Sequence, residues 1–145
     1  WIFKASSTMD SMLGYKEGNL KSLGFFGAKL DDLLTWIPTR IVLFSLPFCC
    51  KQKQSIFKTI KYAWNDGSLD CSPNSGISEA IFAYCAGVKM GGINFYKGKK
   101  YIKPLIAKSN PIANKYSVKR IMILSLKLQF IWLISMFIII QYINL

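Results

Sequence analysis

The stretch 121–143 is almost continuously apolar, and it limits how this chain can fold more than any other feature does. Polar side chains interrupt it only at Ser125, Lys127, Gln129, Ser135 and Gln141. A helix of this length covers a bilayer hydrocarbon core of about 30 Å. We therefore predict a transmembrane helix over 121–143; the alternative is a buried helix in the core of a soluble domain.

A second apolar stretch, 33–50, contains Pro38 and Arg40. Apolar residues at 30, 33, 34 and 37 recur at the spacing of one helix face. The uninterrupted apolar run begins only after Arg40 and is too short to span a bilayer alone. We predict a membrane-embedded or re-entrant helix over 33–50, kinked or restarted at Pro38.

The net charge of the chain is +12, and 52% of its residues are hydrophobic. Its Lys and Arg residues are scattered between apolar blocks, as is typical of charges that flank membrane segments. We therefore expect a lipid bilayer as a partner and no nucleic acid. The excess of positive charge on cytoplasmic loops places Lys115, Lys119 and Arg120 in the cytoplasm and the end of the chain outside.

Between these apolar stretches, 56–64 has Ile56, Ile60 and Ala63 on one side of a helix and lysines elsewhere. This pattern suits an amphipathic helix on an anionic membrane face, ended by the polar residues 65–68.

The region 72–98 gathers turn formers, small polar residues and an acid without hydrophobic periodicity. We predict a turn over 72–76, a helix capped by Ser78 with Glu79 in its first turn, and a stop at Gly91 and Gly92. The loop 72–76, the helix N-terminus and a second, Gly-rich loop that begins at Gly91 offer backbone N–H groups to an anion. The alternative is that these turns only connect apolar segments.

The chain has no His, and its four Cys residues form no C-x-x-C pair. Its chemistry therefore depends on carboxylates, Lys, Tyr, backbone dipoles or a hard cation. Asp10, Asp31 and Asp32 are candidate Mg²⁺ ligands, since Mg²⁺ takes one or two carboxylates and leaves positions for phosphate oxygens. Helix capping by Asp10 and a solvated face for Asp31 and Asp32 are the alternatives.

Five motifs follow one another within residues 3–105. They are Thr-x-Asp-Ser-Met-x-Gly-Tyr-Lys at 8–16, Ala-Lys-Leu-Asp-Asp at 28–32, Trp-Ile-Pro-Thr-Arg at 36–40, Ser-Pro-Asn-Ser-Gly-x-x-Glu-Ala at 72–80 and Gly-Gly-x-Asn-x-Tyr-x-Gly at 91–98. Together they resemble the C-terminal part of the CobD/CbiB family of cobalamin biosynthesis, adenosylcobinamide-phosphate synthase. The chain departs from the usual family pattern at Ser7, Lys29, Thr39 and Cys71.

The resemblance implies a mainly α, multi-pass helical protein of the cell membrane, with Gly/Pro/Asn-rich site loops facing the cytoplasm. Residues 1–145 would form a single membrane domain that is the C-terminal portion of a longer protein. The missing N-terminal half of that protein would be its partner. The first residue, Trp1, agrees with this expectation.

The activity implied is ATP-dependent amide formation between adenosylcobyric acid and aminopropanol or its phosphate, with Mg²⁺ as cofactor. The product is adenosylcobinamide or its phosphate. On this resemblance the catalytic acids are Asp10, Asp31, Asp32 and Glu79, the first three also holding Mg²⁺. The substrate-binding residues are Lys16, Lys29, Arg40, Ser72, Asn74, Ser75, Gly91, Gly92, Asn94 and Tyr96.

Two other functions stay open. One is a non-catalytic, basic membrane anchor or partner-binding protein, and the other is a family member that has lost its activity. Charge and hydrophobicity suit the anchor equally well. The concentration of acids within the loop motifs favours the enzyme.

Overall fold

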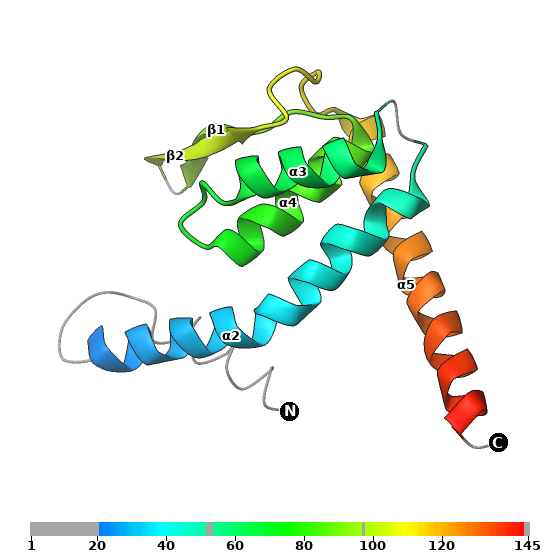
Figure 1. The fold of residues 1–145 in the computed structure, drawn as a ribbon. Helices are drawn as coiled ribbons and strands as arrows, with labels where there is room; N and C mark the ends of the chain where they lie inside the picture. Colours follow the sequence, from blue (N-terminus) through cyan, green and yellow to red (C-terminus); the bar gives the residue numbers. More distant parts are fainter. Residues whose placement is uncertain (1–20, 52–53, 97, 144–145) are drawn as a thin grey trace. The chain divides into compact units, whose positions relative to one another are not determined.

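The structure is a computed structural model that describes residues 21–51, 54–96 and 98–143. In chain order its elements are α2 (Lys21–Ser45), η2 (Leu46–Cys49), α3 (Ile56–Gly67), α4 (Pro73–Ala86), β1 (Met90–Tyr96), β2 (Lys99–Ile106) and α5 (Lys115–Ile143) (Figure 1). The predicted mainly helical fold is confirmed for this part of the chain. The residues fall into two compact units, Trp1–Ile41 and Val42–Leu145.

Helix α2 is longer than the apolar pattern predicts, and Pro38 lies inside it. A proline in a helix interior removes one backbone hydrogen bond, and its ring clashes with the carbonyl four residues earlier, which normally kinks or breaks the helix. The helix α2 nevertheless runs through Pro38 and does not restart there, and the predicted kink stays a prediction. The helix ends at Ser45, where the 3₁₀-helix η2 begins with Pro47 in its first turn. The segment Phe25–Cys49 is long and apolar enough to cross a membrane.

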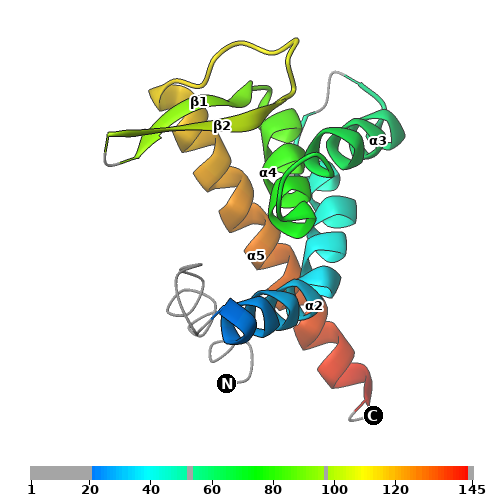
Figure 2. The ribbon, with the colours of Figure 1, turned by 90° about the vertical axis from the view of Figure 1, so that its left-hand side faces the viewer.

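Helices α3 and α4 pack side by side as an αα-hairpin (Figure 2). The predicted helix is confirmed, and its buried residues are Thr59, Ala63 and Gly67, whereas its predicted place on a membrane face stays a prediction. These positions are four residues apart, so they form one stripe along α3. This stripe packs against α4 within the second unit.

The predicted turn over 72–76 is wrong, because α4 begins at Pro73 and Ser72 is the residue before it. Pro73 occupies the first turn, where a missing N–H costs nothing. Gly87, with φ 67°, ends the helix in the left-handed region, well before the predicted stop at Gly91. Glu79 consequently lies beyond the first turn of α4, and Ser78 is not its cap.

Residues 91–96, predicted as part of a loop, belong to strand β1, which pairs antiparallel with β2 in a β-hairpin. Gly92 lies opposite Lys103, and the register shifts between Met90 and Gly92. Gly91 has φ 87°, and a Cβ there would overlap the carbonyl of Pro104. The glycine thus permits a bulge where the hairpin leaves the core.

The core of the second unit consists of small and branched apolar side chains. They are Leu43, Leu46, Ala63, Ile77, Ala80, Ile81, Ala83, Ala86, Val88, Ile106, Ala107, Leu124 and Leu128. Helix α4 contributes more of these residues than any other element, and the others surround it, so α4 is buried on several sides.

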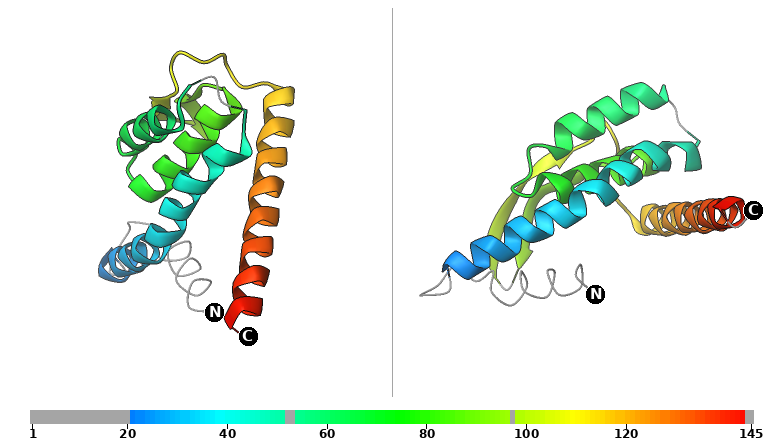
Figure 3. Two further views of the ribbon diagram at one scale, coloured as in Figure 1. Left: turned by 45° about the vertical axis from the view of Figure 1, so that its right-hand side comes forward. Right: turned by 60° about the horizontal axis from the view of Figure 1, so that its bottom comes forward.

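The buried residues of helix α5, Ser117, Leu124 and Leu128, lie in its N-terminal half, and Trp132 packs against the core at the start of its C-terminal half. Its last contact with η2 and the end of α2 includes a hydrogen bond of 3.3 Å from Trp132 Nε1 to Ser45 Oγ. Beyond Trp132 the helix projects past the other elements of its unit (Figure 3). The large apolar side chains on this part of α5 are exposed. A helix that is apolar on all sides is typical of a membrane span, and α5 meets the length and composition for one. This arrangement supports membrane association.

Candidate functional site

Charged side chains from three segments meet beside α4. Lys103 Nζ on β2 lies 3.2 Å from Glu79 Oε1 on α4 and 4.0 Å from Asp70 Oδ2 in the α3–α4 connection. We call Asp70, Glu79 and Lys103 the Lys103 cluster. The Glu79 side chain is 34% exposed and that of Asp70 is 15% exposed. Two carboxylates thus share one ammonium group at a place that solvent reaches.

The N-terminus of α4 adjoins this cluster. Asp70 Oδ1 accepts a hydrogen bond of 3.2 Å from the backbone N–H of Ser72, the residue that precedes α4. Asn74 and Ser75 follow in the first turn, Asn74 buried and Ser75 exposed. The first N–H groups of a helix have no partner within it and carry the positive end of its dipole. The three motif residues therefore stand at an electropositive helix end next to two acids.

The β-hairpin brings the glycine motif to the same side of the unit. Gly92 is paired with Lys103, and the Asn94 side chain donates a hydrogen bond of 3.3 Å to the Gly92 carbonyl. Tyr96 ends β1, and its side chain lies outside the described part of the structure. The fold thus connects the 72–80 and 91–98 motifs through Lys103. Sequence reasoning passed over this lysine because it belongs to neither motif.

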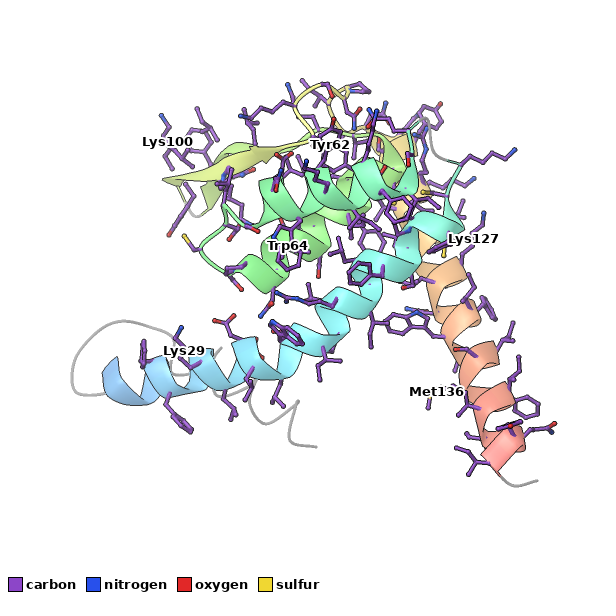
Figure 4. The ribbon with its side chains drawn as sticks, in the orientation of Figure 1. Lys29, Tyr62, Trp64, Lys100, Lys127 and Met136 are labelled. Carbon is purple, nitrogen blue, oxygen red and sulfur yellow. The ribbon has the colours of Figure 1, made fainter. Side chains whose placement is uncertain are left out.

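Four predicted residues lie on α2 in the first unit. Asp31 and Asp32 are half-buried, and Thr35 Oγ1 donates to their backbone carbonyls at 2.7 and 3.3 Å. Lys29 is exposed, with Nζ 5.8 Å from the centre of the Phe25 ring (Figure 4).

The guanidinium of Arg40 lies 4.7 Å from the Trp36 ring centre, and its Nη1 donates to the Trp36 carbonyl at 3.3 Å. Asp10 and Lys16 lie outside the described residues, so their predicted roles stay predictions.

No group of three or more His, Cys, Asp or Glu side chains is placed to hold a metal ion within the described residues. Asp31 and Asp32 supply hard oxygen donors. Mg²⁺ is commonly held by one or two carboxylates, together with phosphate oxygens and water. Asp31 and Asp32 are consecutive in α2, so their side chains leave the helix about 100° apart and do not face one ion together. The oxygen chemistry of either carboxylate, together with phosphate oxygens and water, fits Mg²⁺.

Asp66 has a structural role that no motif indicated. Its Oδ2 accepts hydrogen bonds from the Tyr84 hydroxyl at 2.8 Å and from the Ala107 N–H at 2.9 Å. These partners are 18 and 41 residues away in the sequence, so no local pattern could reveal them. Burial, and then the hydrogen bond to Asp66, raise the pKa of Tyr84 above its usual range. Asp66 thus ties α3 to α4 and to the end of β2.

Comparison with known proteins places these motifs in one family. The family model described as CobD/Cbib protein matches residues 1–125. The match includes all five motifs and ends within α5. No solved structure matches the chain.

Several curated relatives are each named cobalamin biosynthesis protein CobD. The Synechocystis relative is 44% identical over 104 residues, which cover 72% of this chain and 30% of the relative. The Clostridium perfringens relative is 37% identical, with 84% and 40% covered. The Clostridium acetobutylicum relative is 32% identical, with 99% and 46% covered. The chain spans less than half the length of these relatives, and it belongs to the CobD/Cbib protein family.

Proposed function

We propose that this chain is part of an enzyme of cobalamin biosynthesis that joins adenosylcobyric acid to aminopropanol or its phosphate in an ATP-dependent reaction. The observation that carries the proposal is the family match over residues 1–125. Relatives that bear the name cobalamin biosynthesis protein CobD support it. The product would be adenosylcobinamide or its phosphate.

Forming an amide from a carboxylate requires a better leaving group than oxide or hydroxide. A carboxylate oxygen of the corrinoid attacks the γ-phosphorus of ATP, which gives an acyl phosphate and ADP. The amine nitrogen then attacks the acyl carbon, the C–N bond forms, and inorganic phosphate leaves. The proton lost from the amine passes to a base. Such a sequence needs charge neutralisation and positioning and no His nucleophile.

In this reaction we assign the amine to the Lys103 cluster. Glu79 and Asp70 would hold the substrate ammonium, and Glu79 would accept its proton. Lys103 would be the counter-ion of both carboxylates when no amine is bound. Ser72, Asn74 and Ser75 at the start of α4, with Asn94, Tyr96 and the Gly91–Gly92 backbone, would bind polar edges of the substrates.

The nucleotide would be bound by the first unit. Lys16, Lys29 and Arg40 would contact phosphate or carboxylate groups. Asp10, Asp31 and Asp32 would hold Mg²⁺, which supplies charge neutralisation at the phosphate oxygens when bound with ATP. The reacting loops would face the cytoplasm, where ATP is available.

The test is growth complementation in a host that lacks its own adenosylcobinamide-phosphate synthase. The longest reading frame that contains this chain is expressed, and growth is made to depend on cobalamin derived from cobyric acid. We expect rescue by the natural sequence. Glu79→Gln removes the proposed proton acceptor, a change that typically lowers a reaction rate by about a hundredfold or more. Asp32→Asn removes a proposed Mg²⁺ ligand. Both variants should fail to rescue growth.

Two controls sharpen the result. Lys61→Gln removes a charge from an exposed site on α3 outside every motif, and it should rescue fully. Supplying adenosylcobinamide bypasses the reaction and should restore growth with every variant. Failure of well-expressed, membrane-inserted protein to rescue, with the bypass intact, would contradict the proposal.

That failure would favour the second candidate function, a non-catalytic membrane anchor or an inactive family member. The observation behind it is the exposed apolar half of α5, with Phe137, Ile138 and Ile139 each more than half exposed. This surface requires a membrane or an apolar partner whether or not the chain is catalytic.

A further inference from the structure

The second unit contains a cavity of about 540 Å³ on its α5 side, and no predicted site residue is among the described residues that line it. It lies between η2, the end of α4, the connection between β2 and α5, and the N-terminal half of α5. A cavity of this size accommodates a small ligand. Its charged lining residues are Lys51, Arg120 and Lys127, and no Asp or Glu lines it among the described residues. We call it the Lys127 cavity.

Helix geometry explains why two of these cations share the cavity. Arg120 and Lys127 are two turns apart on α5, and Ile123 and Leu124 between them also line the cavity. Lys127 lies where α5 passes η2 (Figure 4). A cation within an apolar span is costly unless it faces a polar or watery space. The cavity provides that space, so the charge of Lys127 need not be buried in an apolar environment.

Arg120 is held at the cavity wall. Its Nη1 donates a hydrogen bond of 2.5 Å to the Ala86 carbonyl at the end of α4. A guanidinium has five N–H donors, so this bond fixes the group and still leaves donors for a ligand. The side chains of Gln54, Ser109 and Asn110 add uncharged donors to the same lining.

The remaining wall carries thiols. Cys49, Cys50 and Cys85 line the cavity. A hydrogen bond with Cys50, and then burial, raise the pKa of the Cys85 thiol above its usual range. Cys85 therefore stays neutral and does not offset the cations. The lining as a whole attracts an anion.

We propose that the Lys127 cavity binds a phosphate-bearing anion, with Arg120, Lys127 and Lys51 contacting the phosphate oxygens. Arg and Lys donors arranged without a competing carboxylate are the usual complement of a phosphate group. The ligand is either a soluble phosphate compound or the headgroup of an anionic lipid, because the cavity adjoins the N-terminal half of a candidate membrane span. The inference stands independently of the ligase reaction.

The thiols allow a direct test in the purified chain. The chain is dissolved in an uncharged detergent, and the rate at which a maleimide alkylates Cys49 and Cys50 is measured by mass spectrometry. The measurement is repeated at increasing concentrations of inorganic phosphate and constant ionic strength. Cys71 is exposed, lies outside the cavity and serves as an internal control. We expect phosphate to slow alkylation at the cavity thiols and to leave Cys71 unchanged. The lipid arm compares nanodiscs of phosphatidylcholine with nanodiscs that also contain phosphatidic acid.

Charge-removing variants identify the contacts. Lys127→Gln should raise, by about tenfold, the phosphate concentration that halves the alkylation rate of the cavity thiols. This is the usual scale for the loss of a charged hydrogen bond. Lys119→Gln is the matched control, because it removes the same charge from an exposed position on α5 outside the cavity. Lys51→Gln serves as a second test variant at an exposed residue, where misfolding is least expected.

Protection by inorganic phosphate supports the proposal with a soluble ligand, and protection only with phosphatidic acid supports it with a lipid. Three results would overturn it. These are no protection in either arm, equal protection by chloride at the same ionic strength, or unchanged protection in both Lys127→Gln and Lys51→Gln.

Discussion

At the residue scale, two glycines set the distance between α3 and α4. A Cβ on Gly76 would overlap the Gly67 carbonyl, and a Cβ on Gly67 would overlap the backbone of Ile77. Both positions are buried. The motif glycine at 76 is therefore explained by close packing of two helix backbones and not by a turn.

This contact predicts the effect of Gly76→Ala. Alanine is the better helix former by about 1 kcal/mol, yet forced overlap in a packed interior costs about 1–3 kcal/mol. We expect net destabilisation, measured as a lower midpoint of thermal unfolding in detergent. Ser75→Ala, at the exposed neighbouring position, is the control and should leave the midpoint nearly unchanged. An unaltered midpoint for Gly76→Ala would show that the helices separate without cost.

The Asp66–Tyr84 hydrogen bond predicts a pH dependence. The folded state raises the pKa of Tyr84 above the unfolded value of about 10. A raised pKa stabilises the fold fully below pH of about 10, and this contribution is lost as pH rises further. Denaturant unfolding between pH 8 and 11 should show stability falling more steeply in the natural chain than in Tyr84→Phe. The variant should also lose about 1 kcal/mol at pH 8. Parallel pH curves would exclude this role of Tyr84.

At the element scale, the β-hairpin is the main departure from the predicted fold. Gly91 and Gly92 are poor strand formers, and their order in the sequence resembles a helix stop followed by a loop. Pairing with β2 overrides this local preference, because the bulge at Gly91 needs a residue without a side chain. The sequence pattern along β1 cannot reveal that β2 pairs with it, because this pairing depends on residues of another segment.

Gly91→Val tests this explanation. The added side chain meets the Pro104 carbonyl and demands φ 87°, which a β-branched residue resists. We expect faster amide hydrogen exchange throughout β1 and β2, with protection in α3 and α4 retained. Ile93→Val, at an exposed position in the same strand, should leave exchange unchanged. Loss of protection in all four elements would mean that the hairpin holds the helices together.

At the scale of the whole molecule, α5 predicts a topology. Fusing alkaline phosphatase or a green fluorescent protein to the end of the chain should give phosphatase activity and little fluorescence, since the C-terminus is predicted to lie outside the cytoplasm. Ile134→Asp with Ile138→Asp places two acids at exposed positions in mid-helix, 59% and 60% exposed. Each costs about 3 kcal/mol on insertion, so the reporters should reverse.

Val118→Asp with Met122→Asp places the same charges in the first turns of α5, near Lys115 and Lys119, and should leave the reporters unchanged. Met136, like the two isoleucines, lies on the part of α5 that projects beyond its unit (Figure 4). Fluorescence from the natural chain would contradict the predicted orientation.

The sequence by itself determined the helical class, the apolar stretch within α5 and the family. These depend on composition, on periodicity along one segment and on the order of the motifs, all of which can be seen in the sequence alone. Placement of site residues was predictable only within a motif. Asp31 and Asp32 adjoin in any helix, and Ser72, Asn74 and Ser75 adjoin in any turn.

Only the tertiary structure decided which distant residues meet. It brought Lys103 to Glu79, gave Asp66 its partners on α4 and β2, and made Gly76 a packing residue. It also joined Lys51, Arg120 and Lys127 around one cavity. The physical reason is that these contacts join residues far apart in the sequence, where side-chain packing and the register of paired strands, and not local propensity, fix the geometry.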